Sequence, residues 1–92
     1  MSPNLPSLRL AVLISGGGRT LLNLRQRIQD GALRAVIATV VSSRSNAAGV
    51  ERSRDAGLRT VVVERRRLSP DAFQREVTQA IAGVDLICMA GF

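Results

Sequence analysis

The amino-acid sequence predicts an α/β fold, with about four strands in a doubly wound parallel sheet of order 3-2-1-4 and three helices. Short apolar runs, typical of strands buried on both faces, alternate along the chain with amphipathic stretches of helical period. Because strand–helix–strand connections are right-handed, this alternation makes the strands parallel and places helices on both faces. Such a sheet has a switch point between strands 1 and 4, where ligands bind beyond the carboxyl ends of the strands.

Local signals mark where the helices begin. Thr20 is expected to cap the first helix, and Ser45 or Asn46 the second. The third has the strongest start, with Ser69 as cap and Pro70 at its first position. The expected strands are 8–14, 35–41, 58–63 and 85–90, and the expected helices are 20–29, 47–56 and 70–82.

Composition excludes several classes of partner. The 92 residues carry a formal net charge of +6, and all 13 basic residues are arginine, a balance that suits phosphate-bearing ligands. The densest basic patch, residues 65–67, is interpreted as a solvated loop, and two Phe with no Tyr or Trp give bases little to stack on. The apolar runs are too short to span a bilayer, and one cysteine without histidine offers neither a disulfide nor a zinc site. We therefore expect a cytoplasmic protein that binds no nucleic acid, membrane or metal. A purely structural or nucleic-acid-binding domain, in which residues 65–67 would contact the nucleic acid, is the remaining alternative.

The segment S-G-G-G-R-T at residues 15–20 is the strongest functional signal in the chain. Glycines let the backbone approach an anion closely, and the first N–H groups of a helix have no internal partner. The helix dipole also favours negative charge at that end. The sequence therefore predicts a phosphate site, with Gly18, Arg19 and Thr20 binding and Gly16 and Gly17 shaping the loop.

This loop has other interpretations. A nucleotide-triphosphatase loop needs a lysine, which the chain lacks. A dinucleotide site needs a third glycine, and Leu21 stands in its place. Arg44, at the exit of the second strand, could still pair with the 2′-phosphate of NADP, so an NADP-binding module stays open. A tight turn without a ligand is the remaining alternative.

Residues 12–21, V-L-I-S-G-G-G-R-T-L, resemble the first strand and loop of the phosphoribosylglycinamide (glycinamide ribonucleotide) formyltransferase family, V-L-I-S-G-x-G-(S/T)-N-L. The likeness continues in S-R-S-N-A at 43–47, in G-V-E-R at 49–52 and in A-G-L at 56–58. It ends in D-L-I-C-M-A-G-F at 85–92, similar to the family's D-(L/V)-(V/I)-V-L-A-G-F. The resemblance implies a Rossmann-like formyltransferase fold, truncated so that residues 8–92 form the N-terminal half of the domain.

The resemblance also implies an activity. The family transfers a formyl group from 10-formyltetrahydrofolate, its co-substrate, to the amine of phosphoribosylglycinamide in de novo purine (IMP) biosynthesis. By position, the loop at Gly18, Arg19 and Thr20 would hold the substrate phosphate, and Gly91 and Phe92 would lie on the folate side. Arg19 and Thr20 replace the family's (S/T)-N pair, and Pro70 replaces an arginine near the folate.

Catalysis is expected to lie elsewhere. The family uses an Asn, a His and an Asp that follow A-G-F, and this chain contains no histidine. We therefore expect no catalytic residue in the chain, which would be the N-terminal piece of an enzyme or an inactive truncated product. Glu51 and Asp55 are interpreted as a solvated helix face beside Arg52 and Arg54, not as an acid–base pair.

The two ends of the chain carry further expectations. Residues 1–7, with two prolines and no periodicity, are expected to form an N-terminal tail. Phe73, Cys88 and Met89 are expected in the core. The fourth strand would be an apolar edge, so we expect marginal stability and self-association, including a homodimer, through that strand.

Overall fold

The computed structural model describes residues 8–90 and 92, so the expected tail at 1–7 and the expected folate-side residue Gly91 lie outside the described residues. The described part is a parallel sheet of four strands in the order β3-β2-β1-β4, which confirms the predicted order. The elements along the chain are β1 (Leu8–Ile14), α1 (Arg19–Gln29), β2 (Ala35–Ser42), α2 (Ala48–Asp55), β3 (Thr60–Val62), the 3-10 turn η1 (Arg65–Arg67), α3 (Pro70–Ala80) and β4 (Leu86–Ala90).

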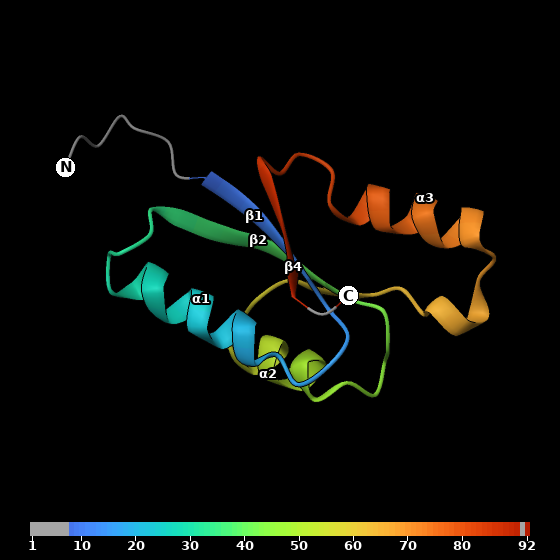
Figure 1. The fold of residues 1–92 in the computed structure, drawn as a ribbon, viewed down its shortest axis with the longest axis horizontal. Helices are drawn as coiled ribbons and strands as arrows, with labels where there is room; N and C mark the ends of the chain where they lie inside the picture. The colour runs from blue at the N-terminus through green and yellow to red at the C-terminus, as the bar shows by residue number, and fades with distance from the viewer. Residues whose placement is uncertain (1–7, 91) are drawn as a thin grey trace.

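Helices cover both faces of the sheet, with α1 and α2 on one side and α3 on the other (Figure 1). On the α1 side, Leu21 is fully buried against Val12 and Ile14 of β1. On the α3 side, Phe73 and Val77 pack against a cluster that includes the buried Leu13. The central strand β1 is therefore apolar on both faces, as the continuous run at 10–14 predicts.

β1 and β4 are held together at their amino ends as well as along their length. The Asp85 N–H donates to the Arg9 carbonyl at 2.8 Å, and the Arg9 N–H donates to Asp85 Oδ2 at 2.8 Å. The two strands then run in parallel register from Leu10 and Leu86 to Ile14 and Ala90. This register brings the carboxyl end of β4 beside the start of the glycine loop.

Two of the three predicted helix caps are wrong. Helix α1 is capped by Gly18 in a left-handed conformation (φ 79°), so Thr20 lies at the second helical position. Helix α2 is preceded by Ala47, with no side-chain cap. The third prediction is confirmed, because Ser69 Oγ accepts from the Ala72 N–H at 3.2 Å and Pro70 opens α3. Short polar residues near a helix start predict the helix, but backbone packing selects the residue that caps it.

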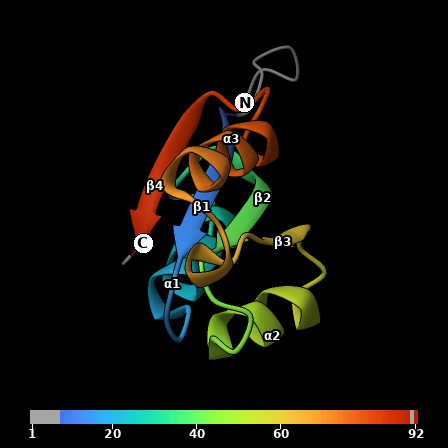
Figure 2. The same cartoon turned by 90° about the vertical axis from the view of Figure 1, so that its right-hand side faces the viewer.

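The strand bounds differ from the predicted ones mainly at β3, which spans only 60–62 of the expected 58–63. The expectation that Met89 is in the core is wrong, since 67% of its surface is exposed. Cys88 on the neighbouring position is partly buried and packs with the α1 side. Figure 2 shows β4 at the edge of the sheet beyond β1. Because successive side chains of β4 point to opposite faces of the sheet, Cys88 lies on a partly covered face and Met89 on an uncovered one.

No helix among the described residues is both long and apolar enough to cross a membrane.

Candidate functional site: the glycine loop between β1 and α1

The loop that follows β1 joins the middle of the sheet to the N-terminus of α1, at the predicted switch point. Gly16 and Gly17 are exposed, whereas Gly18 is buried. Arg19 and Thr20 are exposed in the first turn of α1. The structure therefore brings together all five residues that the sequence selects for a phosphate site.

Three consecutive carbonyls of the loop accept hydrogen bonds from α1 or α2. The Gly16 carbonyl accepts from the Gly49 N–H at 3.0 Å, and the Gly18 carbonyl accepts from the Leu22 N–H at 3.0 Å. Between them, the Gly17 carbonyl accepts from Arg52 Nη1 at 2.8 Å. All of these donors belong to α1 or α2.

In a trans peptide, the C=O group of one residue and the N–H group of the next residue point in opposite directions. Each of these N–H groups therefore points away from the donor that binds the carbonyl of the same peptide. The N–H groups of Gly17, Gly18 and Arg19 therefore point away from those three donors. Successive N–H groups around a left-handed residue at a helix start form an anion-binding concavity. The arrangement can hold a phosphate or a carboxylate through backbone donors.

The inner wall of the loop is the start of α2. A Cβ added to Gly18 would lie 2.9 Å from Gly49 Cα, and a Cβ added to Gly49 would lie 2.8 Å from the Gly16 carbonyl oxygen. A Cβ on Gly49 would also meet Ile14 Cδ1 at 2.7 Å. Both glycines are therefore required by the close approach of two backbones, in addition to the positive φ at Gly18.

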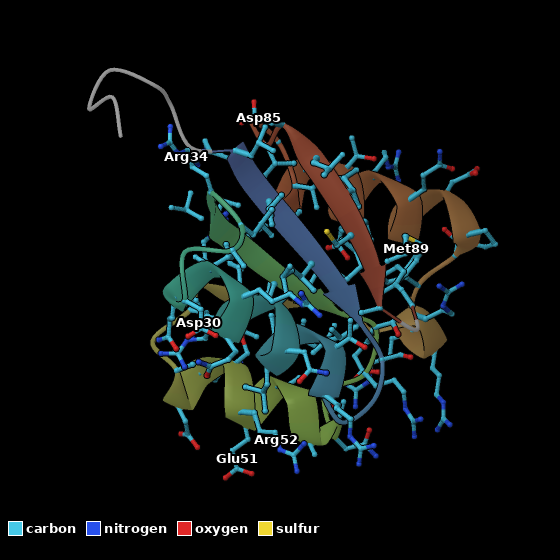
Figure 3. All side chains as sticks on the ribbon, turned by 60° about the vertical axis from the view of Figure 1, so that its left-hand side comes forward. Asp30, Arg34, Glu51, Arg52, Asp85 and Met89 are labelled. Carbon is cyan, nitrogen blue, oxygen red and sulfur yellow. The ribbon has the colours of Figure 1, made fainter. Side chains whose placement is uncertain are left out.

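Sequence reasoning missed Gly49 and Arg52 as residues of this site. They appear in the sequence only within G-V-E-R at 49–52, and Arg52 was placed on a solvated face. Figure 3 labels Arg52 beside Glu51 on α2. A glycine near the start of a helix costs helix stability, and this is the signal that could have indicated a close backbone approach.

The sequence matches the family described as "Formyl transferase" over residues 8–92. This chain belongs to that family. Relatives include the trifunctional purine biosynthetic protein adenosine-3 of Drosophila pseudoobscura, which is 37% identical over an alignment of 92 positions. The alignment covers 95% of this chain and 7% of that protein. The phosphoribosylglycinamide formyltransferase of Escherichia coli (strain K12) is 30% identical over 88 residues, covering 92% of this chain and 42% of that protein.

Solved structures agree with the sequence relatives. The phosphoribosylglycinamide formyltransferase of Coxiella burnetii is similar with a TM-score of 0.88 and 32% identity, over 95% of this chain and 42% of that one. Glycinamide ribonucleotide transformylase 1 of Symbiobacterium toebii is similar with a TM-score of 0.80 and 37% identity, over 94% of this chain and 42% of that one. This chain thus spans less than half the length of these relatives, and its four strands match the formyltransferase fold.

A polar cavity of about 220 Å³ lies at the exits of β2 and β3, lined by Arg44, Ser45, Asn46, Glu64, Arg66 and Arg67. The Ser45 N–H donates to Glu64 Oε1 at 2.6 Å. These Ser45 contacts, with smaller contributions from Arg67 and Arg66, lower the pKa of the Glu64 carboxyl from its ordinary value. Arg44, the residue of the NADP alternative, therefore lies in a cavity that also holds a carboxylate.

Phe92, the described member of the expected folate-side pair, is used in packing. Its ring stacks on Phe73 with centroids 5.7 Å apart. The Arg65 guanidinium lies over both rings, 4.4 Å from the centroid of Phe73 and 5.5 Å from that of Phe92. Arg65 is thus a cation–π partner within the basic turn, while the turn as a whole is exposed, as expected.

The expectation of a solvated face on α2 is confirmed. Glu51, Arg54 and Asp55 are exposed on α2. The described residues contain no group of three or more potential metal ligands.

Proposed function

We propose that this chain supplies the phosphate-binding half of a phosphoribosylglycinamide formyltransferase. The phosphate of phosphoribosylglycinamide is held by the loop at Gly18, Arg19 and Thr20, with Gly16 and Gly17 allowing close approach. The single observation that carries the proposal is the set of three hydrogen-bonded loop carbonyls, so that the N–H groups of Gly17, Gly18 and Arg19 point away from the donors on α1 and α2. The names of the sequence relatives support the substrate class.

Within this proposal, the Arg19 side chain adds a charge that can pair with the phosphate, and the Thr20 hydroxyl adds a donor. Both side chains are exposed in the first turn of α1. The backbone donors do not depend on side-chain identity. An Arg–Thr pair in place of the family's (S/T)-N is therefore compatible with phosphate binding.

The formyl donor is proposed to be 10-formyltetrahydrofolate, bound on the β4 side of the loop in the cytoplasm. Because the Phe92 ring is packed on Phe73 beneath Arg65, the contribution of Phe92 is assigned to its backbone. No residue of this chain is proposed to be catalytic. Formyl transfer by these 92 residues alone would overturn that assignment.

The test compares ligands that differ in one phosphate. Calorimetric titration of the chain with phosphoribosylglycinamide and with its dephosphorylated ribonucleoside should show at least about tenfold tighter binding of the phosphorylated compound, since hydrogen bonds to charged groups are the strong ones. Equal affinities would contradict the proposal. NADP binding that is tighter than that of phosphoribosylglycinamide, and is lost in Arg44→Ala, would favour the dinucleotide alternative instead.

A further inference from the structure

Arg52 lies on α2 and contacts the glycine loop, whereas the loop itself leads into α1. Its Nη1 donates to the Gly17 carbonyl at 2.8 Å, and it lies 35 residues further along the chain. A Cβ placed on Gly17 would be 3.6 Å from the same nitrogen, so the guanidinium is in contact with the loop backbone.

The contact acts on one particular peptide unit. The Gly17–Gly18 peptide has glycine on both sides, and glycine has the widest choice of backbone conformations. Its neighbours are fixed by backbone hydrogen bonds, from Gly49 to the Gly16 carbonyl and from Leu22 to the Gly18 carbonyl. Only Arg52 fixes the Gly17 carbonyl through a side chain, and it thereby sets the direction of the Gly18 N–H.

We infer that Arg52 is a positioning residue for anion binding, which holds the Gly17–Gly18 peptide so that the Gly18 N–H faces the bound phosphate. The inference rests on the proposed function of the loop. The charge on Arg52 also polarises the peptide that it holds, which makes its N–H a better donor. Arg52 acts through the Gly17–Gly18 peptide and is distinct from Arg19, which lies in the first turn of α1.

The test uses three variants of the 92-residue chain and ribose 5-phosphate as the probe. Arg52→Ala should weaken its affinity about tenfold, because a hydrogen bond from a charged donor is lost from the loop. Arg52→Lys, which keeps a charged donor, should restore the affinity to within about twofold. Arg54→Ala removes the same charge from an exposed position of the same helix and should change the affinity less than about twofold.

A second measurement reports the peptide directly, without a ligand. In the free protein, the Gly18 amide resonances should move in Arg52→Ala and stay in place in Arg54→Ala. Unchanged affinity in Arg52→Ala, or equal weakening in both alanine variants, would overturn the inference. If the unmodified chain does not bind ribose 5-phosphate, the proposed function fails, and unmoved Gly18 resonances would separately overturn the role of Arg52.

Discussion

Leu13 of β1 and Met89 of β4 are neighbours in the same row of the sheet, yet their surroundings are opposite. They are paired in parallel register, and 4% of Leu13 is exposed against 67% of Met89. The α3 cluster covers β1 and reaches β2 and β3, whereas Met89 points outward on β4 (Figure 3). The centre of the sheet, which carries the glycine loop, is therefore covered by side chains of this chain. The β4 edge is not covered by the described residues.

The largest expected effect is at the centre. Gly18→Val should lower the free energy of unfolding by about 2–4 kcal/mol, combining a left-handed conformation with an overpacked contact. The φ of 79° and the 2.9 Å approach to Gly49 Cα are the physical reasons. Urea unfolding followed by circular dichroism measures the change.

Gly17→Ala is the matched control for this variant. Its added methyl would meet only Arg52 Nη1, at the ordinary contact distance of 3.6 Å. We expect a change of less than about 1 kcal/mol, in either direction. If the two variants were equally stable, the close packing of the loop on α2 would be wrong.

The next effect tests the other side of the same contact. Gly49→Ala should destabilise the chain by about 1–3 kcal/mol, because its methyl would lie 2.8 Å from the Gly16 carbonyl oxygen. Gly16→Ala has no heavy atom within 4 Å of the added methyl and serves as the control. A Gly49→Ala chain as stable as Gly16→Ala would show that α2 does not brace the loop.

These glycines also mark the limit of sequence-based prediction for this chain. The sheet order, the loop and the Ser69–Pro70 helix start follow from local patterns of polarity and turn residues. The roles of Gly49 and Arg52 do not, because they depend on how α2 packs against a loop more than 30 residues earlier. The capping of α1 by Gly18 instead of Thr20 has the same origin, since the close approach of Gly49 excludes a side chain at that point.

The apolar β4 edge was expected, but the exposure of Met89 was mispredicted, for a related reason. Apolar residues at 85–90 indicate a buried strand, but burial depends on a covering layer that is not encoded within the strand. In the structure, Leu86, Ile87 and Met89 are 45–67% exposed. The side chain of Phe92 has packing partners that these three residues lack, because Phe73 and Arg65 from earlier segments pack on its ring.

At this edge, Met89→Ser should change the free energy of unfolding by less than about 0.5 kcal/mol, since the side chain is mostly exposed. It should nevertheless reduce self-association, measured by sedimentation velocity, if β4 is the contact surface. Val36→Ser, at a residue of β2 that is 47% exposed, is the control. An equal reduction in both variants would contradict a specific role for β4.

The smallest expected effect is at the opposite, β3 side of the sheet. The pKa of Glu64 is lowered from 4.5, chiefly by the Ser45 hydrogen bond. A carboxyl with a lowered folded-state pKa contributes stability above its unfolded pKa and loses it as the pH falls through the folded value. Glu64→Gln should therefore be slightly less stable than the unmodified chain at neutral pH, and the two should converge below about pH 4.5. Thermal unfolding at a series of pH values measures this, and a constant difference at all pH values would contradict it.

The central claim is that the backbone at the carboxyl end of β1 holds the substrate phosphate. A titration of the ¹⁵N-labelled chain with ribose 5-phosphate, followed through its amide resonances, tests this most directly. We predict that the largest saturable shifts are those of Gly17, Gly18 and Arg19, whose N–H groups face away from the donors on α1 and α2. Shifts confined to Arg44, Arg66 and Arg67, which line the cavity at the exits of β2 and β3, or no saturable shift at the loop, would contradict the account.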